Sequence, residues 1–177
     1  MKDNNKPIVV GVDGSRFSVE ALRWALAEGQ RRDCPVRAVL VAHREQFVAA
    51  GRPATVGVGT MLATDPGPEY LRLLDKSVRA VLDERDDPRL DAEVLPGGAA
   101  DVLVAASADA QLLVLGSHGH GRLFEAVLGT VAQHCVQYAA CPVVVIPARL
   151  AVAEQSAVDE SGPAVAPPLA YGPGPIL

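Results

Sequence analysis

The chain has 177 residues, the length of one domain with a tail, because globular domains cluster at about 100 to 150 residues. Its net charge of −5 comes without a basic run, which argues against nucleic acid as the main partner. No stretch approaches the roughly 20 apolar residues of a membrane helix, and the first residues, MKDNNKP, do not resemble a signal peptide. We therefore expect a soluble, cytoplasmic protein.

The cysteine and histidine spacings give no disulfide framework and no zinc knuckle. Cys34, Cys135 and Cys141 are odd in number and form no C-x-x-C motif, so we interpret them as reduced packing thiols. His118 and His120 form an H-x-H pair that could ligate a metal. No carboxylate is spaced to complete such a site, so we favour solvated loop histidines.

Five apolar runs of strand length alternate with segments in which apolar residues recur at helical spacing. In chain order, these patterns predict a strand over 8–13, a helix over 18–32, a strand over 36–43, a helix over 68–85, a strand over 92–95, a helix over 100–108, a strand over 111–116, a helix from Thr130 and a strand over 142–147. This alternation implies right-handed βαβ crossovers. The predicted fold class is α/β, with a doubly wound parallel sheet covered on both faces.

The start of the last helix carries a specific signal. Thr130 and Gln133 form the T-x-x-Q pattern of a capping box, in which the threonine would be the N-cap. The dipeptide Cys141-Pro142 then stops the helix before the final strand.

Two segments do not fit the alternation. Residues 44–67 form a connection far longer than the roughly 2 to 6 residues usual between such elements, and we leave open a cover over a site or a variable surface loop. Residues 150–177 are rich in Ala, Pro and Gly and lack periodicity, which predicts a disordered tail. The folded domain is therefore expected over residues 1–149.

The end of the first strand is one candidate binding segment. In open α/β sheets, ligands bind beyond the carboxyl ends of the strands, where the strand order reverses. Gly11 allows a tight bend there, and the Asp13 carboxylate could accept hydrogen bonds from ribose hydroxyls. The alternative is that Asp13 and Ser15 only cap the first helix.

The end of the fourth strand is the second candidate segment, and it is rich in glycine. Main-chain N–H groups of such a loop can approach phosphate oxygens, and the N-terminus of the next helix favours an anion. Arg122 could offset part of the charge of a polyphosphate. The alternative is a flexible turn before an ordinary capped helix. The candidate residues are Gly116, Ser117, His118, Gly119, His120, Gly121, Arg122, Gly129 and Thr130.

This glycine pattern is neither of the two common nucleotide fingerprints. The chain contains no G-x-x-x-x-G-K-[ST] loop, so the lysine and hydroxyl of P-loop enzymes are missing. The glycines are spaced G-x-x-G-x-G after the fourth strand rather than G-x-G-x-x-G after the first, which argues against a dinucleotide.

The pattern instead resembles the universal stress protein family. Its ATP-binding members carry G-x-x-G, nine residues and then G-[ST], and Gly116, Gly119, Gly129 and Thr130 match that spacing. The segments IVVGVDGS, LLVLGSHG and CPVVVIP are also similar to the family. The resemblance covers roughly residues 7–148 and leaves the central loop and the tail unmatched.

The resemblance implies a five-stranded parallel sheet in the order 3-2-1-4-5, of the adenine nucleotide alpha hydrolase-like type. It implies ATP, accompanied or not by Mg²⁺, lying across the ends of strands one and four. Gly11 and Asp13 would meet the ribose and adenine, the loop 116–122 with Gly129 and Thr130 would hold the phosphates, and His43 would flank the adenine.

The resemblance also implies a homodimer formed through the last strand. The leading function is a non-enzymatic, ATP-dependent regulator of stress or dormancy responses that acts on protein partners the sequence does not identify. No general base is identifiable, so we expect at most slow ATP hydrolysis. The alternatives are a slow ATPase or phosphotransferase and an interaction module that binds no nucleotide.

Overall fold

A computed structural model describes residues 6–42, 66–82, 87–118 and 128–147. Strands and helices alternate through these residues as the sequence pattern predicts. The elements are β1 (Ile8–Val12), α1 (Arg16–Arg32), β2 (Val36–Ala42), α3 (Pro68–Leu82), β3 (Leu90–Pro96), α4 (Ala99–Ser107), β4 (Leu112–Gly116), α5 (Thr130–Tyr138) and β5 (Val143–Ile146).

Several predicted features lie outside the described residues. They are most of the 44–67 connection, the tail 150–177, and the candidate residues His43, Gly119, His120, Gly121 and Arg122. The predicted helix over 68–85 is described through Leu82.

The five strands form one parallel sheet in the order β3-β2-β1-β4-β5, which confirms the predicted fold class. β1 lies at the centre, where Ile8 pairs with Val36 of β2 on one side and with Leu112 of β4 on the other. The strand order reverses between β1 and β4. Their adjacent carboxyl ends are therefore the point at which a doubly wound sheet binds ligands.

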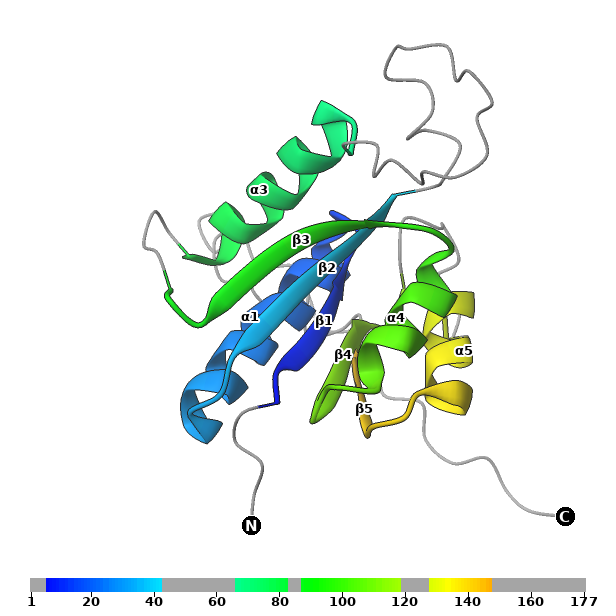
Figure 1. Ribbon diagram of the computed structural model, residues 1–177. Helices are drawn as coiled ribbons and strands as arrows, with labels where there is room; N and C mark the ends of the chain where they lie inside the picture. The colour runs from blue at the N-terminus through cyan, green and yellow to red at the C-terminus, as the bar shows by residue number, and fades with distance from the viewer. Residues whose placement is uncertain (1–5, 43–65, 83–86, 119–127, 148–177) are drawn as a thin grey trace, which may run out of the picture.

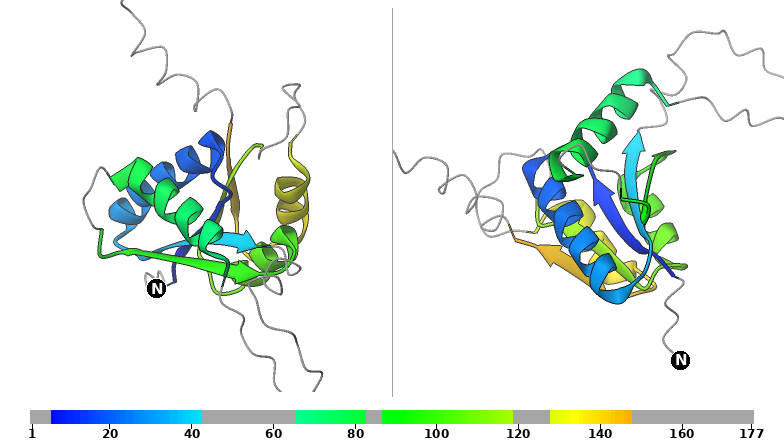
Figure 2. Two further views of the ribbon diagram at one scale, coloured as in Figure 1. Left: turned by 90° about the horizontal axis from the view of Figure 1, so that it is seen from above. Right: turned by 90° about the vertical axis from the view of Figure 1, so that its left-hand side faces the viewer.

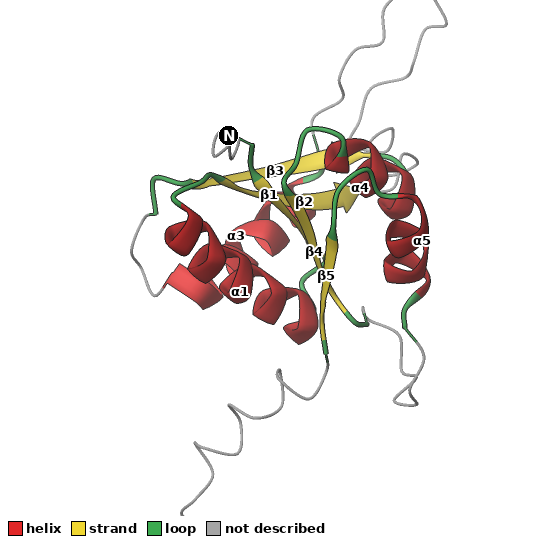
Figure 3. Cartoon of the chain, turned by 90° about the horizontal axis from the view of Figure 1, so that it is seen from below, coloured by secondary structure: helices red, strands yellow, loops and turns green. Residues whose placement is uncertain are grey.

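Helices cover both faces of the sheet, with α1 and α3 on one face and α4 and α5 on the other (Figures 1 and 3). Successive residues of a strand point to opposite faces, so one central strand serves two cores. Ile8 and Val10 pack with Leu22 of α1, whereas Val9 packs with Leu103 of α4 and Cys135 of α5. The two helical layers therefore lie on opposite sides of β1, an arrangement that Figure 2 shows from above and from one side.

The cysteines are free thiols, as the sequence analysis expects. Cys34 and Cys135 are buried and Cys141 is half-buried. Burial raises the pKa of the Cys135 thiol to about 11, so this group is a neutral part of the core at physiological pH. Within the described part of the chain, no helix is long and apolar enough to cross a membrane.

Candidate functional site

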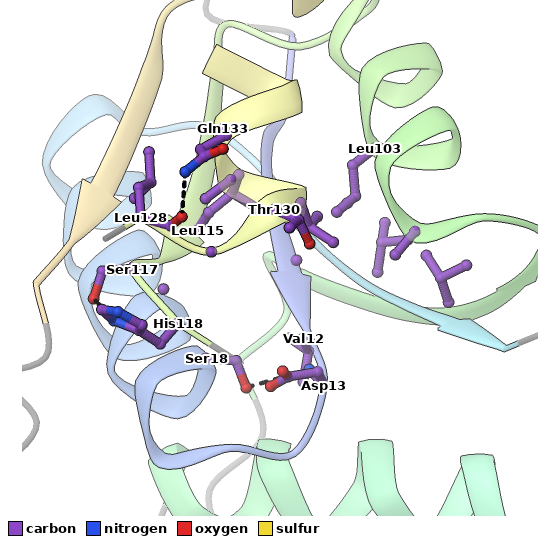
Figure 4. A pocket seen from close by; sticks show the side chains of 18 residues that line it. Val12, Asp13, Ser18, Leu103, Leu115, Ser117, His118, Leu128, Thr130 and Gln133 are labelled. Atoms are coloured by element: carbon purple, nitrogen blue, oxygen red, sulfur yellow. Dashed lines mark hydrogen bonds between the residues drawn. The ribbon is translucent and has the colours of Figure 1, made fainter. Parts of the chain in front are cut away.

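A cavity of about 600 Å³ lies at the carboxyl edge of the sheet, against the starts of α4 and α5 (Figure 4). Its volume is in the range of roughly 300 to 1,000 Å³ that small-molecule sites occupy. Residues from β1, β2, β4 and three helices line it: Gly11, Val12, Asp13, Ser18, Val39, Val41, Ala99, Leu103, Leu115, Gly116, Ser117, His118, Leu128, Gly129, Thr130, Val131, Ala132 and Gln133.

The cavity brings together every described residue that the sequence analysis nominates. Segments far apart in the chain meet here because β1 and β4 are neighbours in the sheet and α5 begins at the same edge. The residues concerned are Gly11, Asp13, Gly116, Ser117, His118, Gly129 and Thr130.

The turn after β1 is held by its own side chains. Ser15 is the N-cap of α1, and its hydroxyl accepts a hydrogen bond from the N–H of Ser18 at 3.2 Å. An Asp13 carboxylate oxygen accepts the N–H of Ser15 at 2.9 Å, and the Ser18 hydroxyl accepts the N–H of Asp13 at 3.2 Å. The capping role considered for Ser15 is therefore confirmed, whereas Asp13 holds the turn before the cap and also lines the cavity.

Gly11 has a packing reason to lack a side chain. A Cβ at this position would lie 2.8 Å from Leu115 Cδ2 and 3.1 Å from Leu103 Cδ1. The side of Gly11 where a Cβ would stand is thus occupied by two leucine side chains. They belong to the apolar part of the cavity wall.

Gly116 also has a packing reason to lack a side chain. A Cβ on Gly116 would lie 2.9 Å from the main-chain carbonyl carbon of Phe17, which cannot move without α1. A Cβ on Gly129 would instead meet Ser117 O at 3.4 Å, an ordinary contact. The first glycine of the motif therefore lets α1 approach the end of β4, whereas Gly129 has room for a side chain.

Two of the motif amides are used inside the protein. The N–H of Ser117 donates to the carbonyl of Ile146 at 2.8 Å, which extends the sheet past the end of β4. The Ser117 carbonyl in turn accepts the N–H of Gly129 at 2.9 Å. These two N–H groups are therefore engaged within the protein, and the amides after Gly129 are the ones that the described part of the motif leaves for an anion.

The predicted capping box is wrong by one residue. The N-cap of α5 is Gly129, and Thr130 is the first helical residue. Gln133 consequently falls one position too late in the helix for a box, and its side-chain Nε2 donates to the Leu128 carbonyl at 2.7 Å. Gly129 has no side chain with which to cap this end.

Within the described part of the chain, the first-turn amides of α5 are not capped. The leading N–H groups of a helix have no partner within the helix. Among the described residues, the N–H groups of Thr130, Val131 and Ala132 have no acceptor, and all three residues line the cavity. The partial positive charge of the helix start therefore faces the cavity.

His118 lies at the edge of the site, beside α1. Its Nδ1 is 3.0 Å from the Ser117 hydroxyl, and its ring centre is 5.9 Å from that of Phe17. Its Nε2 is buried and has no hydrogen-bond partner in the described part of the chain. Within residues 6–42, 66–82, 87–118 and 128–147, no three His, Cys, Asp or Glu side chains gather as a metal site.

The sequence analysis missed the apolar wall of the cavity. This wall is formed by Val39 and Val41 of β2 with Leu103 of α4, and by Leu128 before α5. These residues look like ordinary core positions in the sequence. The predicted strand order could have identified them. It places β2 beside β1, and it requires the connection through α4 to pass the same edge of the sheet.

The fold and the cavity define the class of protein: a doubly wound α/β protein with a ligand-sized cavity at its switch point. Residues 4–147 match the model of the universal stress protein family, so the chain belongs to that family.

Curated relatives agree with this assignment. A universal stress protein of Mycobacterium tuberculosis is 32% identical over 139 residues, which is 78% of this chain and 46% of the relative. The chain thus spans about half the length of the mycobacterial relatives it matches. A universal stress protein of Methanocaldococcus jannaschii is 30% identical over 143 residues, covering 80% of this chain and 81% of the relative.

Solved structures of the family share the fold. A universal stress protein in complex with cAMP aligns with a TM-score of 0.57 at 18% identity, over 82% of this chain and 98% of the other. The universal stress protein of Archaeoglobus fulgidus in complex with dAMP aligns with a TM-score of 0.52 at 22% identity, over 81% of this chain and 98% of the other. At these identities the likeness concerns the fold.

Proposed function

We propose that this chain binds ATP in the cavity at its switch point and acts as a nucleotide-dependent regulator. One observation carries the proposal. A single cavity joins a carboxylate at the end of β1, Asp13, to the open first-turn amides of α5, at the edge where β1 and β4 lie side by side.

The two polar ends of the cavity suit the two polar parts of a nucleotide. The amides of Thr130 and Val131 would donate to phosphate oxygens, assisted by the dipole of α5. The Asp13 carboxylate would accept hydrogen bonds from ribose hydroxyls. Val39, Val41 and Leu103 supply an apolar surface for the base.

The structural neighbours support an adenine nucleotide as the ligand. The two described above hold cAMP and dAMP, which share the adenine ring and carry one phosphate. The triphosphate and an accompanying Mg²⁺ are our extension, based on the glycine motif that continues in the sequence through Gly119 to Arg122.

The regulatory part of the proposal concerns the outer strand. β5 pairs with β4 on one side and forms an edge of the sheet on the other. An edge strand offers unpaired N–H and C=O groups to another chain. We therefore assign a homodimer to this edge, and nucleotide occupancy would change the surface offered to the second copy or to a regulatory protein partner.

The test is a thermal melt with and without Mg-ATP, accompanied by calorimetry with ATP, ADP and AMP. A ligand at about 100 times its Kd stabilises the native state by about 2.7 kcal/mol, which raises the Tm of a chain of this size by roughly 5 to 10 °C. The absence of any heat with every adenine nucleotide would contradict the proposal.

Two variants of Gly129 locate the site. Asp and Asn are both good N-cap residues, so Gly129→Asp and Gly129→Asn should fold. The carboxylate repels a phosphate, so Gly129→Asp should abolish the nucleotide-induced shift, while Gly129→Asn keeps part of it. Gln137→Glu adds the same charge at an exposed position farther along α5 and should keep the whole shift.

A further inference from the structure

We infer that Gln133 is a positioning residue of the anion end of the cavity. Its side-chain amide donates a hydrogen bond to the carbonyl oxygen of Leu128, the residue directly before the N-cap of α5. The inference rests on the proposed adenine-nucleotide site. It adds to that site a residue that acts through the main chain rather than on the ligand.

Gln133 engages two successive carbonyl groups where the chain enters α5. Its side-chain Nε2 donates to Leu128 O at 2.7 Å (Figure 4). Its main-chain N–H donates to Gly129 O at 2.9 Å. Leu128, Thr130 and Gln133 all line the cavity. The main-chain acceptors around the N-cap are thus paired within the protein, while the amides of the first turn are left open.

This arrangement favours an anion for an electrostatic reason. A carbonyl oxygen carries partial negative charge, and an unpaired one beside the open amides would repel a phosphate. The Gln133 amide donates to that oxygen and fixes the peptide unit before the helix. A methionine at 133 would keep the size of the side chain but would leave Leu128 O without this donor.

An ordinary helix-surface bond is the competing explanation. Such a bond would stabilise α5 and would influence all ligands of the cavity alike. The positioning role instead predicts a selective effect on ligands that carry a phosphate. Adenosine and AMP separate the two explanations, since they differ by that one group.

The experiment measures Kd for AMP and for adenosine by calorimetry with the full chain. In Gln133→Met, the Kd for AMP should rise about three- to tenfold, the size expected for one hydrogen bond, while the Kd for adenosine changes less than about twofold. Gln133→Glu should raise the Kd for AMP further, because a carboxylate cannot donate and adds negative charge. Gln137→Met, on the same helix, should leave both Kd values at the wild-type level.

The outcomes separate the inference from the proposed function. An unchanged ratio of the two Kd values in Gln133→Met, or equal weakening of both ligands, would overturn the positioning role. So would a wild-type protein that binds AMP no more tightly than adenosine, although the adenine site would survive that result. A wild-type protein that binds neither ligand would remove the proposed function and this inference together. Gln133 is exposed, so the Met variant should retain its fold, which a melt without ligand checks.

Discussion

The starts of α1 and α5 lie at the same edge of the sheet and are treated in opposite ways. At α1, Ser15 caps the helix and Asp13 holds the turn. At α5 the N-cap is Gly129, which has no side chain to cap with. The start of α1 is capped by a side chain of the protein, whereas the start of α5 presents uncapped amides to the cavity. Of two such ends, the uncapped one is the place for an anionic ligand.

The same contrast separates the two glycines that line the phosphate end. The close approach of Phe17 requires a glycine at position 116, because a Cβ there would lie 2.9 Å from the Phe17 main chain. Gly129 faces only ordinary contacts. The two glycines of one sequence motif therefore serve different purposes, one for packing and one for leaving a helix end uncapped.

The largest expected effect is at Gly116. Gly116→Ala should lower the free energy of unfolding by about 1 to 3 kcal/mol, the usual cost of overpacking, since the obstacle is main chain and not a flexible side chain. Urea denaturation without nucleotide measures it. A variant as stable as the wild type would show that α1 can shift away from β4 without cost.

The next effect is at the cap of α1. Ser15→Ala removes the acceptor of the Ser18 N–H and should lower the free energy of unfolding by about 1 kcal/mol. Nucleotide binding should remain, provided that Asp13 keeps its position. The same urea titration, followed by calorimetry with AMP, checks both statements. A full loss of binding would mean that the cap and the ligand site are one unit.

The smallest effect tests the comparison most directly, by giving α5 the cap that α1 has. Gly129→Ser should raise the free energy of unfolding by a few tenths of a kcal/mol, because serine is a slightly better N-cap than glycine. The new hydroxyl would occupy a first-turn amide, so the Kd for AMP should rise a few-fold. A tighter complex would contradict the view that an uncapped α5 serves the ligand.

The fold could be predicted because its signals are local and repeated. Apolar runs such as 8–13 and 111–116, separated by helical spacing, define a parallel α/β sheet from the sequence alone. The glycines after β4 and the carboxylate after β1 could be assigned to one edge, since all parallel strands end there. Seven nominated residues line the cavity for this reason.

The finer features of the site depend on contacts between distant segments. The motif T-x-x-Q is compatible with an N-cap at Gly129 or at Thr130. In the structure the Gly129 carbonyl accepts the Gln133 N–H, which makes Gly129 the N-cap, and the Ser117 carbonyl holds the Gly129 N–H. The packing role of Gly116 requires the approach of Phe17. The apolar wall requires β2 and α4 to be placed in space.

The peptide unit of Ser117 links the cavity to the outer strand. Its N–H is bonded to Ile146, the last residue of β5, and its carbonyl is bonded to the N-cap of α5. Hydrogen bonds in series polarise one another, so lengthening one weakens the next. The outermost strand and the ligand-facing helix are therefore joined through one peptide unit by two hydrogen bonds in series.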